Sequence, residues 1–371
     1  PMEGVYHNSF HPDEAYTLRV ITSMDLDQLQ LNPHWFVKGT LQFYVLGASF
    51  KLASLANLVE LHSWWAYSEI PEQLARLYLT GRLVTVVMSL ATIALTFILG
   101  SILYNRRVGL LGALFMSVLP VDVVNAHYMK TDVPMTFWLT IGAILSTLIW
   151  RYGSWKWYIA TGIILGLATA TKYSSLGFWA IPLVAHLLRT TQGPHPKQYI
   201  RKLMSPRLVA LYIGAMSGFL AGCPYCLISF NEFRAGIIEP FDLNTTNDLF
   251  LDGIGRGPIL WYYLTKITYY SMGVALQSIT LAGLLVAFAR RRSADIFLIG
   301  MIVPYLILTN VLGYGFARYL VPLGPPLTLL GAALLVSIFD NAQRRGNLRA
   351  VRPGILALCS IIILYSGLYS F

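Results

Sequence analysis

Residues 83–104, LVTVVMSLATIALTFILGSILY, form an unbroken run without a charged side chain. About twenty apolar residues are enough for a helix to cross the hydrocarbon core of a bilayer. The run is followed at once by Asn105-Arg106-Arg107, a basic cluster of the kind that marks the cytoplasmic end of a membrane helix. This stretch predicts a membrane-spanning helix, and the rest of the chain repeats the pattern.

Composition supports the same fold class for the whole chain. Hydrophobic residues make up 56% of the sequence and charged residues only 12%, whereas a soluble domain carries about 25% charged residues. The net charge of +10 does not indicate a nucleic-acid partner, because the basic residues occur in short clusters between apolar runs. We therefore predict an all-α integral membrane protein, with lipid headgroups and phosphates as the partners of its basic residues.

The apolar runs predict a polytopic bundle of about ten transmembrane helices in a single domain, 1–371. An amphipathic run near 39–58 is expected to lie along the membrane surface, so 1–72 is read as an outer loop with interfacial helices. The expected spans are 74–104, 108–124, 133–150, 157–172, 175–189, 207–228, 259–289, 294–313, 318–339 and 354–371.

The charges of the connecting loops predict the topology. Every second loop is basic: Asn105–Arg107, Arg151–Lys156, Lys197–Arg207, Arg290–Arg292 and Arg344–Arg352. The alternate loops carry the acidic residues, so the basic loops are assigned to the cytoplasm and the N-terminal stretch to the opposite face. Because no signal peptide precedes that stretch, we expect a first membrane helix upstream of Pro1 that this chain lacks.

The cysteines give no clear functional indication. Cys223-Pro224-Tyr225-Cys226 has the spacing of a thiol–disulfide active site, but it ends an apolar run and lacks the βαβ context of such sites. The sequence favours ordinary helix-end residues there, and Cys359 is expected to be a buried apolar position.

Carboxylates in or beside the predicted outer loops are the candidates for acid–base chemistry. His11-Pro12-Asp13-Glu14 places two adjacent acids near the membrane, where one suits a general base and the other a positioning or metal-binding role. Asp132 lies two residues before Pro134, at the start of an apolar run. Taken singly, the first pair also fits a solvated turn, and Asp132 also fits a helix N-cap.

Three cations are predicted on the same face as these acids: Lys38, Lys172 and Arg318. Arg318 and Tyr319 begin an apolar run, where a cation is disfavoured by the helix dipole unless an anion lies nearby. Each lysine alone also fits an interfacial, snorkelling side chain. Their common sidedness with the acids predicts a site that holds a phosphate and activates a nucleophile.

At this point the chain resembles the GT-C glycosyltransferases, most closely the dolichyl-phosphate-mannose protein mannosyltransferase-like family and the lipid A aminoarabinose transferases. The resemblance lies in His11–Glu14, Leu31–Leu41, Lys130–Phe137, Gly166–Lys172 and Ala317–Pro326, which occur in the family's order. A departure is Gly39-Thr40 after the loop lysine, where the family often has a second proline.

The resemblance implies inverting transfer of a sugar from a polyprenyl-phosphate donor on the non-cytoplasmic face. It implies Asp13 as the catalytic base, with Glu14 adjacent and Asp132 as the second-loop acid, and Lys38, Lys172, Arg318 and Tyr319 near the donor phosphate. The resemblance fixes no cofactor, and a divalent cation gathered by Asp13, Glu14 and Asp132 is left open.

Several alternatives are left by the sequence. The acceptor is a protein, a lipid or a glycan, and composition favours a bacterial plasma membrane over the endoplasmic reticulum. The alternative function is a transporter or flippase of lipid-linked sugars, which needs the same cations but no base.

Overall fold

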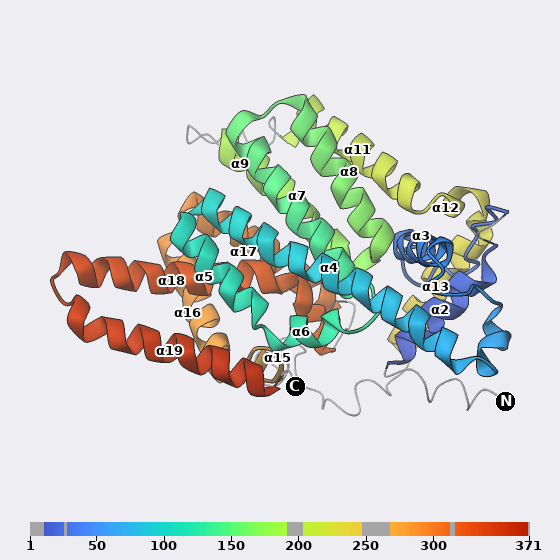
Figure 1. Ribbon diagram of the computed structural model, residues 1–371. Helices are drawn as coiled ribbons and strands as arrows, with labels where there is room; N and C mark the ends of the chain where they lie inside the picture. The colour runs from blue at the N-terminus through green and yellow to red at the C-terminus, as the bar shows by residue number, and fades with distance from the viewer. Residues whose placement is uncertain (1–10, 26–27, 191–202, 247–267, 312–315, 370–371) are drawn as a thin grey trace.

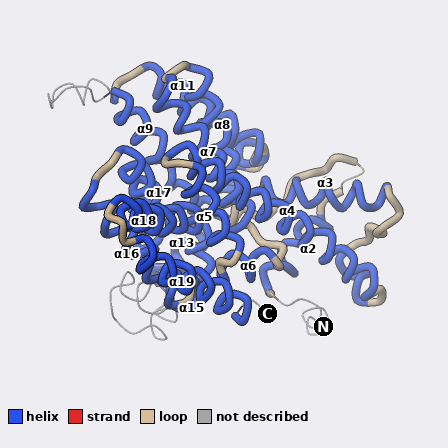
Figure 2. The backbone as a smooth tube through the Cα atoms, turned by 60° about the vertical axis from the view of Figure 1, so that its left-hand side comes forward, coloured by secondary structure: helices blue, strands red, loops and turns tan. Residues whose placement is uncertain are grey.

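The computed structural model describes residues 11–25, 28–190, 203–246, 268–311 and 316–369 (Figure 1). The described residues are helical and contain no strand, as the tube in Figure 2 shows; an isolated bridge joins Asp25 to Gln30. The prediction of an all-α bundle is therefore confirmed.

The helices agree closely with the predicted apolar runs. They are α2 (Pro12–Ser23), α3 (Leu41–Leu55), α4 (Pro71–Leu103), α5 (Arg106–Ser117), α6 (Pro120–Ala126), α7 (Asp132–Tyr152), α8 (Trp155–Thr171), α9 (Ala180–Thr190), α11 (Pro206–Gly222), α12 (Tyr225–Ile228), α13 (Phe230–Thr246), α15 (Thr268–Met272), α16 (Val274–Arg290), α17 (Ser293–Val311), α18 (Gly324–Arg344) and α19 (Leu348–Tyr369). Short 3-10 helices add η1 (Trp64–Ser68), η2 (Tyr173–Trp179) and η5 (Ala317–Leu323).

Among the described helices, five are by themselves long and apolar enough to cross a membrane. These are α4, α7, α17, η5 with α18, and α19. A sixth candidate is the pair α5 and α6, which the sequence predicted as one run and which bends by 58° at the break. Pro120 explains the break, because proline lacks the N–H that would continue the helix. The remaining predicted spans correspond to shorter helices: α8, α9 preceded by η2, α11 and α16. The predicted span 259–289 begins outside the described residues, and only its part from residue 268 on, which holds α15 and α16, can be compared.

Contacts between loops support the predicted sidedness. Arg107 binds Asp340 through two hydrogen bonds of 2.9 and 3.3 Å, and Arg151 donates to the carbonyl oxygen of Ile102 at 2.9 Å. Arg189 in turn donates to the carbonyl oxygen of Arg151 at 3.1 Å. These contacts join the loops near 105, 151, 189 and 340 at one end of the bundle, as the predicted alternation requires.

Close packing of α8 against α11 depends on two pairs of glycines, and the members of each pair are four residues apart. Gly162 and Gly166 lie on α8, and Gly214 and Gly218 lie on α11. A Cβ at Gly166 would lie 2.1 Å from the carbonyl oxygen of Ala215, and one at Gly218 would lie 2.1 Å from that of Ile163. Small residues at this spacing let two membrane helices approach backbone to backbone. This contact places Ala170, in the last turn of α8, beside Gly222 at the end of α11.

The N-terminal part of the chain packs as a second, smaller buried cluster. Leu18 of α2 lies with Phe43, Leu46 and Phe50 of α3 and with Leu77 of α4. In Figure 1 these helices gather at the end of α4 away from α5. Helix α2 is thereby held against the bundle with its first turn, which carries Asp13 and Glu14, directed toward α7 and η5.

Candidate functional site

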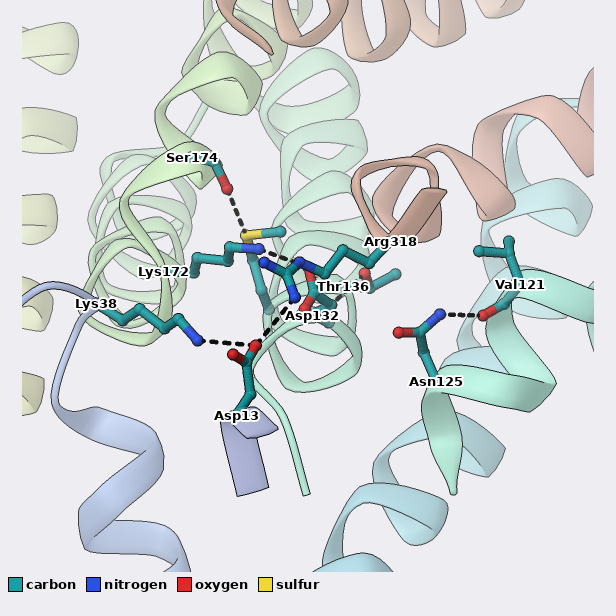
Figure 3. A network of polar contacts seen from close by, with 10 residues as sticks. Asp13, Lys38, Val121, Asn125, Asp132, Thr136, Lys172, Ser174 and Arg318 are labelled. Carbon is teal, nitrogen blue, oxygen red and sulfur yellow. Dashed lines mark hydrogen bonds and ion pairs between the residues drawn. The ribbon is translucent and has the colours of Figure 1, made fainter. Parts of the chain in front are cut away.

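Five segments far apart in the sequence bring charged side chains to one place (Figure 3). Helix α2 contributes Asp13, the loop before α3 contributes Lys38, and the first residue of α7 is Asp132. The end of α8 contributes Lys172 and η5 contributes Arg318. The structure thus brings together the residues that the sequence predicted for the site, with one exception described below.

Asp13 is the centre of the first half of the site. Its carboxylate oxygen Oδ2 accepts a hydrogen bond from Lys38 Nζ at 3.1 Å and another from Arg318 Nη1 at 3.1 Å. Burial alone would raise the pKa of Asp13, but the charges of Lys38 and Arg318 outweigh it and lower the pKa to about 2. Asp13 is therefore ionised throughout the physiological pH range, and it is the ion-pair partner of both Lys38 and Arg318.

Local sequence explains how Asp13 is aimed. His11 is the N-cap of α2, and its Nδ1 accepts the backbone N–H of Asp13 at 3.1 Å. Pro12 follows as the first residue of the helix, where the missing N–H has no consequence. The acidic first turn is favoured by the positive end of the helix dipole.

The second half of the site is the pair of Asp132 and Lys172. Lys172 Nζ donates to Asp132 Oδ1 at 2.6 Å, and the two side chains are 8% and 2% exposed. Lys172 Nζ also lies 4.2 Å from the centre of the Tyr319 ring, a cation–π contact. Asp132 does begin its helix, but its side chain binds a lysine and not the N-terminal amides, so capping does not account for it.

The Lys38 loop, residues 36–40, is positioned by close contact with the end of α8. A Cβ at Gly39 would lie 2.0 Å from the carbonyl oxygen of Ala170, so no larger residue fits without moving the backbone. This contact explains the departure from the family's proline pattern noted above. The Tyr173 hydroxyl donates to the carbonyl oxygens of Phe36 at 3.0 Å and Lys38 at 3.2 Å.

Glu14, although adjacent to Asp13, lies apart from this cluster. Its side chain is fully buried, and its carboxylate accepts two hydrogen bonds from Arg82 of α4, at 2.9 and 2.8 Å. It also accepts the backbone N–H of Met129 at 2.9 Å. One helical step separates the two acids, so they point in different directions and Glu14 joins α2 to α4 and to the loop before α7.

Two charged residues near the site were not singled out from the sequence. One is Arg82, and a lone arginine inside an apolar run was a signal for a buried acidic partner. The other is Lys130, which is only 5% exposed and lies over the Tyr128 ring at 4.9 Å. Burial, with added repulsion from Arg318, lowers the pKa of Lys130 to about 8, although Asp132 opposes the shift.

Among the residues that the structure describes, the charges of the site do not balance. Lys38, Lys130, Lys172 and Arg318 face Asp13 and Asp132, so the cations exceed the carboxylates by two. Over the part of the chain that the structure describes, no group of three or more His, Cys, Asp or Glu side chains is arranged to hold a metal ion. The site as described is suited to an anion.

Comparisons with known proteins agree with this fold. Residues 77–214 match the family described as dolichyl-phosphate-mannose-protein mannosyltransferase. ArnT from Cupriavidus metallidurans, solved bound to undecaprenyl phosphate, is similar with a TM-score of 0.60 and 16% identity, over 88% of this chain and 56% of ArnT. The oligosaccharyltransferase AglB from Archaeoglobus fulgidus, in complex with an inhibitory peptide and a dolichol-phosphate, has a TM-score of 0.59 and 13% identity, over 97% of this chain and 52% of AglB. No curated protein sequence matches significantly.

The fold is therefore that of the GT-C superfamily of membrane glycosyltransferases, which confirms the resemblance seen in the sequence. The match to the mannosyltransferase family model covers residues 77–214, less than half of the chain. The chain spans about half the length of the solved structures that it matches.

Proposed function

We propose that this protein is a glycosyltransferase that moves a sugar from a polyprenyl-phosphate donor to an acceptor, with inversion at the anomeric carbon. The observation that carries the proposal is the cluster of four cations and two carboxylates at the outer end of the bundle. Its two excess positive charges fit a lipid phosphate, and its ionised Asp13 fits a proton acceptor. The GT-C fold and the undecaprenyl phosphate bound by ArnT support the same donor class.

In the proposed reaction the donor phosphate binds at Lys172, Arg318, Lys130 and Lys38. The phosphate competes with Asp13 for Lys38 and Arg318, so its arrival releases the carboxylate and raises the basicity of Asp13. The acceptor then attacks the anomeric carbon from the face opposite the phosphate while Asp13 takes its proton. The bond between that carbon and the phosphate oxygen breaks, and the cations stabilise the charge on the leaving phosphate.

Asp132 and Glu14 have supporting roles in this proposal. Asp132 holds the Lys172 ammonium in place, and without a partner of opposite charge that buried cation would be costly. Glu14 holds α2 against α4 through Arg82, which keeps Asp13 at the cluster. We propose a location in the bacterial plasma membrane, with the site on the non-cytoplasmic face and a protein, lipid or glycan as acceptor.

The test uses the purified protein in proteoliposomes with a radiolabelled undecaprenyl-phosphate hexose and its dolichyl counterpart. Wild type should release label from the lipid, and Asp13→Asn should do so at least about 100-fold more slowly, since a general base typically contributes 10²–10⁴-fold. Lys51→Met, which changes a lysine of α3 outside the cluster, is the matched control and should keep full turnover.

Two outcomes would contradict the proposal. Label that crosses the bilayer without leaving its lipid would indicate a transporter instead. Equal release by wild type and Asp13→Asn would exclude Asp13 as the base.

A further inference from the structure

The Cys223-Pro224-Tyr225-Cys226 segment takes a conformation in the folded chain that its sequence alone did not indicate. Cys223 follows the last residue of α11, and Cys226 lies in the single turn of α12. The backbone N–H of Cys226 donates to the carbonyl oxygen of Cys223 at 3.2 Å, which closes a turn between them. Both thiols are free and buried, and they belong to one buried cluster.

This geometry is compatible with a disulfide. The ends of such a turn have Cα atoms less than about 7 Å apart, and disulfides join Cα atoms at about 4.4–6.8 Å. Because the backbone turn already brings the two residues within this range, closing the bond needs only a movement of their side chains. We infer that Cys223 and Cys226 form a disulfide on the non-cytoplasmic side, and that this bond stiffens the support beneath the Lys38 loop.

The pair belongs to the outer end of the bundle. The Thr40 hydroxyl donates to the carbonyl oxygen of Gly222 at 2.8 Å, which joins the Lys38 loop directly to the residue before Cys223. The basic loops lie at the other end of α11, where Pro206 begins the helix. Thiols on the non-cytoplasmic side meet an oxidising environment, in which disulfides persist.

The pair is also packed against the loop that carries Lys38. Cys223 and Cys226 share one buried cluster with Phe36 and Ala170. Thr40 binds the residue before Cys223, and the Tyr173 hydroxyl donates to the carbonyl oxygens of Phe36 and Lys38. A change in the distance between the two sulfur atoms therefore acts directly on the segment that positions Lys38.

The surroundings favour a structural bond over a redox-active one. Cys223 is fully buried and Cys226 is 3% exposed. Burial raises the pKa of both thiols, that of Cys226 to about 11, whereas catalytic cysteines have lowered pKa values and partial exposure. Formation is expected to be slow and the product stable.

The chemistry needs a disulfide oxidant, for which oxidised glutathione serves as the probe. The Cys226 thiol loses its proton, and its sulfur attacks one sulfur of glutathione disulfide and releases one glutathione. The Cys223 thiolate then attacks the Cys226 sulfur and releases the second glutathione. One disulfide is reduced to two thiols, and two thiols of the protein are oxidised to one disulfide.

In the first test the full chain is held in lipid nanodiscs with oxidised or reduced glutathione. It is then denatured and labelled with a maleimide-linked polymer, which reacts with free thiols and so counts them. The three cysteines of the sequence should all react in the reduced sample, and only Cys359 should react in the oxidised one. Cys359→Ser, the control, should then leave no reactive thiol, and Cys226→Ser should leave two. Three reactive thiols after oxidation, or glutathione adducts at both positions, would overturn the inference.

The second test uses wild type alone and so does not depend on whether the variants fold. The tryptic peptide that follows Arg207 contains both cysteines, and an internal disulfide lowers its mass by two hydrogen atoms. Amide hydrogen exchange over residues 36–44 should become at least about threefold faster on reduction. Unchanged exchange with the disulfide formed would refute the coupling to the Lys38 loop.

Discussion

Replacing Glu14 by Gln would remove a buried charge that three donors hold in place. Arg82 donates to the carboxylate at 2.9 and 2.8 Å, and the Met129 N–H donates at 2.9 Å. The amide keeps the shape of the side chain but leaves the Arg82 guanidinium without a compensating charge. Removing one partner of a buried ion pair costs about 3–5 kcal/mol. We expect the low end, about 3 kcal/mol, because the Arg82 side chain is 23% exposed.

Asp13→Asn is the matched variant, since it makes the same chemical change one residue earlier. The pKa of Asp13 falls from 3.8 to about 2 in the folded protein, which corresponds to a stability contribution on the order of 2 kcal/mol. Because the folded pKa is the lower one, this contribution is complete above about pH 4 and is lost as the pH falls toward 2. The same variant frees Lys38 and Arg318, so phosphate binding should be unchanged or tighter while transfer is lost.

The two variants are compared by thermal unfolding in one detergent, by binding of undecaprenyl phosphate and by release of the labelled sugar. Glu14→Gln should lower the midpoint of unfolding by at least about 5 °C, on the basis of about 2–4 °C per kcal/mol for mid-sized chains. Its folded fraction should turn over within about tenfold of wild type. A Glu14→Gln protein with an unchanged midpoint and no turnover would refute the assignment, because Glu14 would then be part of the chemistry.

Three further predictions concern single positions. Because Lys130 has a pKa of about 8, its positive charge is lost between pH 7 and pH 9, and the affinity for undecaprenyl phosphate should fall about tenfold over this range. Binding titrations at fixed salt should show a flatter dependence of affinity on pH for Lys130→Met. Lys172→Met leaves Asp132 buried without its partner and should destabilise the fold by about 3–5 kcal/mol, and adding Asp132→Asn should recover part of that loss in chemical denaturation. Gly166→Ala should destabilise the fold by about 1–3 kcal/mol, because the added Cβ would lie 2.1 Å from the carbonyl oxygen of Ala215. Gly354→Ala is the control and should not destabilise it, because nothing lies within 4 Å of its added Cβ. Equal midpoints of thermal unfolding for the two variants would contradict this packing.

The positions of the helices could be predicted from the sequence with few errors. Membrane helices need long apolar runs, so the approximate position of each span could be predicted from the local composition. The break between α5 and α6 was not predicted, although Pro120 was a signal for it. The end of α11 at Gly222 was also missed, and Pro224 explains why the helix does not continue.

The candidate site was predictable in membership but not in pairing. Asp13, Asp132, Lys38, Lys172 and Arg318 were selected because charges beside apolar runs are costly and lie on one face. Nothing local to the sequence specified that Asp13 binds Lys38 and Arg318 while Asp132 binds Lys172.

The two adjacent acids show this limit most clearly. In the sequence Asp13 and Glu14 are equivalent carboxylates, and both were candidates for chemistry. Successive helical residues point about 100° apart, so only the packing of α2 determined which acid faces the cations and which faces Arg82.

The sequence by itself therefore determined the class of fold and predicted the sidedness and the candidate site residues, because hydrophobicity and charge are local properties of the chain. The tertiary structure alone decided which charges are paired and which described cations remain in excess at the site. It also decided that Cys223 and Cys226 lie beneath the Lys38 loop. These features depend on contacts between helices far apart in sequence, such as the approach of α8 to α11.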